Sequence, residues 1–383
     1  MMSLSESFAS HFSRQGEVEF FSPGRVNLIG EHIDYCGGLV LPMAINRGTR
    51  AIAAKNDDSV IRIYSERFNE QQIIPLRSGS RLPIAPAHWS NFAVGVLSLL
   101  SPHKPLVGVD IYVTDDISAG GLSSSASFAL LLTHIILWAA DDLPSDTSAR
   151  LELARMCQKV EHEFIGVNCG IMDQASIALG GIVMLDCADL SFETVAVDFT
   201  GHSLLVMDTR HPRNLAGSKY NERVVEIAKI STHLRKQYDI SNLCDLSFES
   251  LDEALTLLDD PVLRRRLTHV VAENERVKRA VTALREGDLV TFGGLMDLSH
   301  QSLHEDYEVT GDALHTIVTL SRQQPGTLGA RMIGAGFGGC ALALVATSDV
   351  TAHNAAVANE FEKATGVVPN IFSVRPDRAV GLL

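Results

Sequence analysis

The sequence has no surplus of basic residues and no long apolar run. Lysine and arginine number 32 against 46 aspartates and glutamates, which gives a formal charge of −14. Nucleic acids and anionic membranes are bound by basic surfaces, so this balance argues against both as partners. The longest apolar stretch, Phe128 to Ala140, is shorter than the ~20 residues of a membrane span. The first residues also lack an apolar core of signal-peptide length, so we expect a cytoplasmic protein.

Disulfide patterns and the common nucleotide motifs are missing as well. The six cysteines form no CxxC pair and have no dense spacing, so we expect reduced thiols. No GxxxxGK[ST] phosphate loop is present, because Pro212 stands where the glycine ahead of Gly217-Ser218-Lys219 would be. The HRD and DFG motifs of protein kinases are also absent. These absences exclude two large classes of nucleotide-dependent enzyme.

The length and the order of elements indicate the fold class. A chain of 383 residues is about twice the usual single-domain length, so two domains that share a cleft are expected. Strand-like runs fill the first third, and strands and helices do not alternate strictly afterwards. This order favours an α+β fold over a doubly wound parallel sheet. We place the domain boundary near residue 195, which gives segments 1–195 and 196–383.

Hydrophobic periodicity predicts the individual elements. The expected strands are 17–21, 39–44, 49–54, 60–64, 107–113, 182–186, 203–208, 341–345 and 370–374. The expected helices are 89–100, 123–140, 148–164, 221–238, 264–285 and 350–365. The helix over 123–140 is apolar nearly all round, which predicts that it is buried.

A serine-rich turn, Gly121-Leu122-Ser123-Ser124-Ser125-Ala126-Ser127, precedes this apolar helix. Glycine lets the backbone turn sharply, and the first N–H groups of a helix have no partner within the helix. Together with the helix dipole these donors form an anion site, and a serine hydroxyl there can ligate Mg²⁺. Simple N-capping is the alternative, but one serine would suffice for it. The pattern favours phosphate binding.

A second glycine-rich segment, Gly334 to Gly339, matches GxGxxG letter for letter. The dinucleotide fingerprint requires a helix directly after it, whereas residues 340–345 read as a strand. We therefore expect a loop that lies against a phosphate or at a domain junction, and no Rossmann site.

Two segments are dense in polar side chains. Residues 24–35 place Arg25, Glu31, His32 and Asp34 directly after a strand, which suits a polyol because each hydroxyl both donates and accepts. A solvated loop is the alternative, and nothing like HExxH supports a metal cluster. In residues 166–174, Asp173 sits among apolar residues.

The carboxylate of Asp173 either caps a helix or acts as a base toward a hydroxyl. Glu161, at helical spacing upstream, is either a metal ligand or a residue on an exposed helix face.

Taken together, these segments resemble the galactokinase branch of the GHMP small-molecule kinases. The residues that carry the resemblance are GRVNLIGEHIDY (24–35), GLSSSAS (121–127), CGIMDQ (169–174), SKYNER (218–223) and RMIGAGFGGC (331–340). They occur in the family's order and spacing, and the similarity extends from about residue 18 to residue 375. Five motifs in register are far more specific than any one of them.

The resemblance implies a fold and a set of roles. It implies an N-terminal mixed α/β domain, similar to domain 2 of ribosomal protein S5, and a C-terminal ferredoxin-like domain, with the active site between them. Asp173 matches the catalytic base, and Arg25 matches the arginine that faces the transferring phosphoryl group. The residues that match sugar contacts are Glu31, His32, Asp34, Gly170 and Tyr220.

The resemblance also implies an ATP site with Mg²⁺. The residues that match the loop over the phosphates are Gly121, Ser123, Ser124, Ser125, Ala126 and Ser127. Trp89 matches an aromatic residue near the adenine. Ser125 and Glu161 match the metal-binding positions.

Four positions depart from the family pattern. Most galactokinases have threonine at Ile33 and asparagine at Cys36, and the HIDYCG form here is similar to the N-acetylgalactosamine kinase branch. The usual proline ahead of the serine loop is missing from Ile117-Ser118-Ala119-Gly120, and Ala335 replaces a usual glycine.

The leading hypothesis is therefore MgATP-dependent phosphorylation of the C1 hydroxyl of D-galactose. Kinases for N-acetylgalactosamine or arabinose are alternatives, as is a regulator that binds sugar and ATP without catalysis. The expected partners are a small sugar and ATP, and the sequence is compatible with a monomer.

Overall fold

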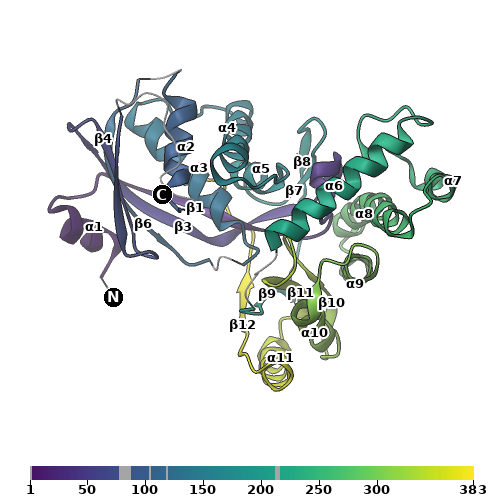
Figure 1. Cartoon of the computed structure of the whole chain (residues 1–383). Coiled ribbons are helices and arrows are strands. Elements are labelled where there is room, and N and C mark those ends of the chain that lie inside the picture. The colour runs from purple at the N-terminus through teal and green to yellow at the C-terminus, as the bar shows by residue number, and fades with distance from the viewer. Residues whose placement is uncertain (1, 77–87, 103–104, 118–119, 212–215) are drawn as a thin grey trace.

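The computed structural model describes residues 2–76, 88–102, 105–117, 120–211 and 216–383 (Figure 1). Its largest sheet has the strand order β13-β1-β3-β6-β4-β5. These strands are β1 (Val18–Asn27), β3 (Pro42–Asn56), β4 (Val60–Ser65), β5 (Glu70–Pro75), β6 (Gly108–Asp115) and β13 (Gly381–Leu382). Neighbours pair antiparallel except β4 and β6, which run parallel, so the sheet is mixed.

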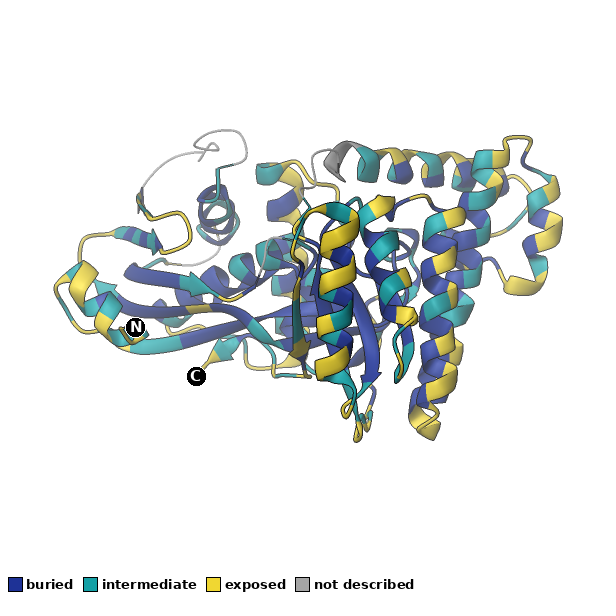
Figure 2. Ribbon diagram, turned by 90° about the horizontal axis from the view of Figure 1, so that it is seen from below, coloured by how far each residue is buried: buried dark blue, intermediate teal, exposed yellow. Residues whose placement is uncertain are grey.

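Helices cover both faces of this sheet. One face carries α2 (Asn91–Leu100), α3 (Ser124–Ala139), α4 (Thr147–Val160) and α5 (Met172–Leu179). The other face carries α1 (Leu4–Phe12), whose Phe8 packs against Ile52 and Tyr112. Successive side chains of a strand point to opposite faces, so Ala51 and Ala53 of β3 face the α3 side instead. Figure 2 shows the resulting pattern, with buried residues on the helix sides that face the strands.

A second, antiparallel sheet lies on the other side of the molecule's centre (Figure 1). Its strands, in the order β10-β11-β9-β12, are β10 (Thr327–Met332), β11 (Cys340–Ala346), β9 (His202–Asp208) and β12 (Asn370–Val374). The helices against it are α9 (Leu289–Glu305), α10 (Gly311–Arg322) and α11 (Val350–Thr365).

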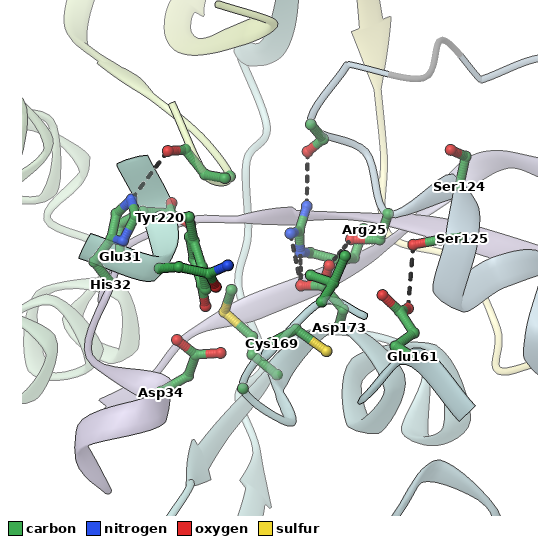
Figure 3. Close-up of a pocket in the computed structure, with 18 of the residues that line it drawn as sticks. Arg25, Glu31, His32, Asp34, Ser124, Ser125, Glu161, Cys169, Asp173 and Tyr220 are labelled. Atoms are coloured by element: carbon green, nitrogen blue, oxygen red, sulfur yellow. Dashed lines mark hydrogen bonds and ion pairs between the residues drawn. The ribbon is translucent and has the colours of Figure 1, made fainter. Parts of the chain in front are cut away.

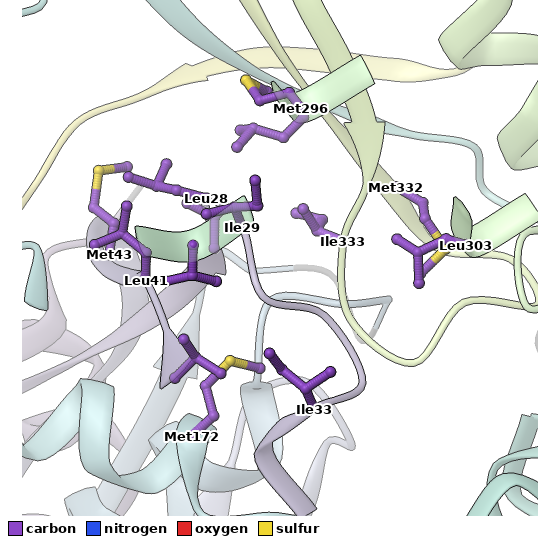
Figure 4. Close-up of a cluster of buried hydrophobic side chains, with 14 of the residues drawn as sticks. Leu28, Ile29, Ile33, Leu41, Met43, Met172, Met296, Leu303, Met332 and Ile333 are labelled. Carbon is purple, nitrogen blue, oxygen red and sulfur yellow. The ribbon is translucent and has the colours of Figure 1, made fainter. Parts of the chain in front are cut away.

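A third group of elements joins the two parts. It consists of α6 (Ala216–Leu234), α7 (Leu251–Thr256), α8 (Pro261–Glu286) and a small sheet of β2 (Leu39–Val40), β7 (Val183–Asp186) and β8 (Phe192–Thr194). One continuous hydrophobic cluster runs through the junction, with Leu28 and Ile29, which directly follow β1, close to Met296 of α9 and Ile333 after β10 (Figure 4).

The structure confirms the α+β fold class and most predicted elements. The predicted helix over 350–365 and the predicted strand over 370–374 match α11 and β12. Helix α3 is buried along most of its length, as its apolar sequence predicts. Residues 340–346 form a strand, so the loop over 334–339 opens no helix. Elements that the prediction lacks are α1, β5, α5, α7, α9, α10, β8, β10 and β13.

The chain's last strand returns to the first sheet. After β12, Gly381 and Leu382 pair with Phe21 and Phe20 of β1. The division into 1–195 and 196–383 stays a prediction. Within the part of the chain that the structure describes, no helix is long and apolar enough to cross a bilayer.

Candidate active site

Twelve of the predicted site residues line one cavity of about 320 Å³ between the two parts of the fold (Figure 3). They are Arg25, Glu31, His32, Asp34, Gly121, Ser123, Ser124, Ser125, Glu161, Gly170, Asp173 and Tyr220. The cavity also has a wall that the sequence did not predict, formed by Gly166, Val167, Cys169, Met172, Asn221, Gly334 and Ala335. Five of these seven lie inside the resemblance motifs, and Gly166 and Val167 lie just before one of them. Their place in or beside the motifs could therefore have identified them as site residues.

Arg25 and Asp173 form the central ion pair of this cavity. The Nε of Arg25 donates to Oδ1 of Asp173 at 2.8 Å, and a terminal nitrogen lies 2.6 Å from the same oxygen. The guanidinium also donates to the carbonyl of Gly121 at 2.7 Å. Arg25 is buried, whereas 28% of the Asp173 side chain is exposed, so the carboxylate remains accessible from the cavity.

The serine loop reaches the same carboxylate. Ser123 adopts a left-handed conformation with φ of 58°, and its side chain makes no capping bond to α3. Its hydroxyl donates instead to Oδ2 of Asp173 at 2.6 Å. The helix dipole and the first N–H groups of α3 thus face a site that already contains Asp173. This geometry argues against the simple N-cap interpretation of Ser123.

Local backbone packing brings the serine loop to β1. The N–H of Arg25 donates to the carbonyl of Leu122 at 3.1 Å. A Cβ at Gly24 would lie 2.7 Å from that same carbonyl oxygen, so glycine is needed for this close approach. The register of β1 against β3 shifts between Pro23 and Arg25, which re-aims Arg25 toward the loop.

Glu161 lies at the end of α4, where the helix widens into a π turn over Glu161–Ile165. The residue is 6% exposed, and its carboxylate accepts from Ser125 Oγ and Gln174 Nε2, each at 3.1 Å. Burial, together with the nearby charge of Asp173, raises the pKa of Glu161 to about 7. The prediction left a metal ligand and an exposed face residue open for Glu161, and the structure excludes exposure.

The polar loop after β1, residues 28–35, forms the other end of the cavity. Burial and the charges of Asp173 and Glu31 raise the pKa of Asp34 to about 7. A Cβ at Gly170 would overlap the Asp34 carboxylate, which explains the glycine there. Burial lowers the pKa of His32 to about 3, so its imidazole is neutral. Tyr220 of α6 packs against His32 with ring centroids 5.6 Å apart.

Three predicted ATP-binding residues lie outside the cavity. The Ser127 hydroxyl is buried against the carbonyl of Ser22 at 2.8 Å, and Ala126 is also fully buried. Trp89 precedes α2, stacks on Phe68 with ring centroids 5.7 Å apart and donates its indole N–H to Glu70.

The four departures from the family pattern fall in different places. Ile33 and Cys36 are buried in the hydrophobic cluster behind the polar loop and do not line the cavity. Ala335 lines the cavity and accepts a hydrogen bond from His32 Nε2 at 3.2 Å. Ser118 and Ala119 lie outside the described residues.

Comparison with known proteins agrees with this geometry. Three family models match the chain: the galactokinase galactose-binding signature at residues 6–55, the GHMP kinase N-terminal domain at 91–181 and the GHMP kinase C-terminal region at 280–363. The galactokinase of Enterococcus faecalis is 41% identical over 98% of this chain and 97% of its own length. The chain belongs to the galactokinase family. The resemblance stated from the motifs is thereby confirmed.

Other members of the galactokinase family give the same result. The Streptococcus thermophilus galactokinase is 42% identical over 96% of both chains. The crystal structure of Lactococcus lactis galactokinase complexed with galactose superposes with a TM-score of 0.92 at 38% identity, covering 99% of each chain. A mevalonate kinase structure, at 20% identity and a TM-score of 0.68, shares the two-domain GHMP fold.

Proposed function

We propose that this chain transfers the terminal phosphoryl group of ATP to the C1 hydroxyl of D-galactose. The observation that carries the proposal is the meeting of the serine loop and Asp173 in one cavity, where Ser123 Oγ lies 2.6 Å from Asp173 Oδ2. An anion site at the N-terminus of α3 thus lies beside a carboxylate that can orient a hydroxyl. Membership of the galactokinase family and the galactose in the Lactococcus lactis structure support D-galactose as the acceptor.

In the proposed reaction, Asp173 orients the C1 hydroxyl and accepts its proton. The hydroxyl oxygen then forms a bond to the γ-phosphorus as the bond to the β–γ bridging oxygen breaks, and ADP leaves. Phosphoryl transfer depends mainly on positioning and charge stabilisation. Arg25 and the N–H groups of the serine loop stabilise the negative charge between donor and acceptor.

The sugar is held, in this proposal, by the loop that follows β1 and by its neighbours. Glu31, Asp34 and Tyr220 present carboxyl and hydroxyl groups to the cavity, and Gly170 leaves room for Asp34. The neutral His32 completes this wall. Because Ile33 and Cys36 lie behind the loop, the HIDYCG form gives no reason to replace D-galactose as the acceptor.

A magnesium site fits beside the serine loop. Ser125 and Glu161 supply a hydroxyl and a buried carboxylate 3.1 Å apart, which are the hard oxygen ligands that Mg²⁺ prefers. The described residues contain no group of three or more acidic, histidine or cysteine side chains placed to hold a metal. Mg²⁺ is typically bound by one or two protein groups plus phosphates and water, so the pair suffices. When bound, Mg²⁺ would neutralise phosphate charge.

The predicted roles outside the cavity keep the status of proposals. Trp89 lies near the adenine in this proposal, and Ala126 and Ser127 hold the start of α3 behind the phosphates. A cytoplasmic location and a monomeric state also stay predictions from the sequence.

A panel of sugars tests the function directly. We expect the purified protein to release ADP from MgATP with D-galactose, and far more slowly with N-acetylgalactosamine or arabinose, in a coupled ADP assay. Phosphorus NMR of the product then identifies the phosphorylated carbon. D-galactose among the poor substrates would contradict the choice of sugar, and galactose binding without ADP release would contradict the activity.

A further inference from the structure

Helix α8 packs behind the polar loop that contains Glu31. It contributes no residue to the cavity wall, and its residue Glu273 lies outside the segments that match the family models. Yet Glu273 is fully buried and points at the loop that contains Glu31. A buried carboxylate is costly unless it is paired and hydrogen-bonded, so its partners indicate its role.

The Glu273 carboxylate binds the loop through the backbone. Its Oε1 accepts from the N–H of Gly30 at 2.9 Å and from the N–H of Glu31 at 3.3 Å. Gly30 has a φ of +96°, and a Cβ there would lie 2.7 Å from the carbonyl of Leu39 and 2.9 Å from Val277 of α8. The loop backbone is therefore pressed against α8 at the point where Glu273 binds it.

The other polar groups of Glu31 are also held, its carbonyl by α8 and its carboxylate by Arg331 of β10. One turn before Glu273, His269 donates its Nε2 hydrogen to the carbonyl of Glu31 at 3.0 Å. The Glu31 side chain lies 3.1 Å from a terminal nitrogen of Arg331, and both side chains are almost completely buried. Arg331 in turn donates to the carbonyl of Asn27 at 2.8 Å. Helix α8 thus holds the N–H groups of Gly30 and Glu31 as well as the carbonyl of Glu31.

The carboxylate is itself held in place and charged. Ser299 of α9 donates to its Oε1, and Nε of Arg276 donates to its Oε2, each at 2.6 Å. Burial would raise the pKa of Glu273, but Arg276, His269 and Arg331 lower it to about 2. A rigid, ionised carboxylate is a strong acceptor for the neighbouring N–H groups of Gly30 and Glu31.

We propose that Glu273 is a positioning residue for sugar recognition, which acts by fixing the backbone of Gly30 and Glu31 so that Glu31 faces the acceptor. The inference rests on the proposed function, because it assigns the Glu31 loop to the sugar. It predicts a specific failure when Glu273 is altered. The sugar site loosens, while the serine loop at the start of α3 keeps its hold on ATP.

The test compares Glu273→Gln with wild type in steady-state kinetics. The amide keeps the shape of the carboxylate, but its NH₂ meets a donor on either side, because the loop lies at one oxygen and Arg276 at the other. We expect the KM for D-galactose to rise about tenfold, with the KM for ATP and kcat within about twofold of wild type. An unchanged KM for D-galactose in a folded Glu273→Gln protein would overturn the proposal.

Ser299→Ala is the matched control. It removes a hydrogen bond to the same carboxylate without touching the loop, so it should lower the melting temperature and leave the sugar KM unchanged. A rise in the sugar KM equal to that of Glu273→Gln would show a general packing role and overturn the inference.

If Glu273→Gln fails to fold, His269→Leu tests the same contact. It releases the Glu31 carbonyl, and the same selective rise in sugar KM is expected. A wild-type sugar KM in that variant would overturn the inference.

Wild-type turnover separates this test from the proposed function. If wild type leaves D-galactose unphosphorylated, the proposed function fails. The variants are then compared by calorimetry on the panel sugar that wild type binds.

Discussion

Asp173 shows how a few neighbours define the role of one residue. Arg25 occupies one carboxylate oxygen and the Ser123 hydroxyl occupies the other, so the group is held from two sides while 28% of the side chain remains exposed. A carboxylate fixed in this way presents its remaining lone pairs in one direction, toward the cavity. Positioning of this kind accounts for much of the rate of phosphoryl transfer.

Removing the Ser123 hydroxyl should therefore lower kcat more than it weakens binding. We expect Ser123→Ala to reduce kcat roughly tenfold or more, because a hydrogen bond to a charged group contributes about 1.5–3 kcal/mol. The KM for D-galactose should change little. Thr133→Val, which removes a buried hydroxyl bonded to the carbonyl of Ala129 on the same helix, is the control. Equal kcat losses in both variants would contradict a specific role for Ser123.

Individual residue types in the site were more predictable than their partners. The motifs identified Arg25, Asp173 and the serines, because each motif is local in sequence. The Ser123–Asp173 contact spans 50 positions and the Glu273–Gly30 contact spans 243, so local spacing gives no sign of either. Ser127 has the same residue type as its neighbours, yet helix rotation turns its hydroxyl into the core.

At the scale of elements, helices and strands were predicted correctly where their hydrophobic periodicity was strong. Strongly patterned segments such as 350–365 were placed correctly, whereas α5 was missed because its eight residues follow a glycine-rich turn and carry Asp173 near the start. The helix over 148–164 was predicted as one regular element. The structure ends α4 at Val160 and continues it as a π turn over Glu161–Ile165. This turn places Glu161 in the cavity wall. Single π turns within helices often occur at functional sites.

The burial of Glu161 makes stability depend on pH. Its pKa is about 7 in the folded chain against an ordinary value of 4.5, so the folded state retains a proton that the unfolded state has lost. The contribution of this proton to stability is fully present below the ordinary pKa and is lost as pH rises through 7. We expect Glu161→Gln to raise the melting temperature at about pH 8 in magnesium-free buffer and to change it little at about pH 4.

Glu163→Gln is the control for this thermal measurement, because Glu163 lies in the same turn with 51% of its side chain exposed. It should leave the pH dependence as in wild type. A Glu161→Gln effect that is equal at both pH values would contradict the link to ionisation. Added Mg²⁺ and ATP should stabilise wild type more than Glu161→Gln at about pH 8.

At the scale of the whole molecule, the site exists only because two parts of the chain meet. Arg25 and the serine loop come from the first sheet and its helices, whereas Tyr220, Gly334 and Ala335 come from elements beyond residue 195. The length of the chain predicted two domains and a cleft, and the five motifs predicted that their residues gather there. Neither predicted that β13 returns to pair with β1, since its two paired residues carry no periodic signal.

The overall charge of −14 is unfavourable for a triphosphate, and the cavity wall contains the carboxyl groups of Glu31, Asp34, Glu161 and Asp173. Attraction must therefore be local, through Arg25, the N-terminus of α3 and a bound cation. Burial keeps Asp34 and Glu161 partly protonated near neutral pH, because the pKa of each is about 7. The site thus limits its own negative charge before substrates arrive.

The most direct test of the account is Asp173→Ala, examined by turnover and by ATP binding on the same preparation. Asp173 meets the acceptor hydroxyl in this account, whereas ATP is held by the serine loop. The variant should therefore lose D-galactose phosphorylation in the coupled ADP assay and still bind ATP in calorimetry. Near-normal turnover by a folded Asp173→Ala protein would contradict the central claim.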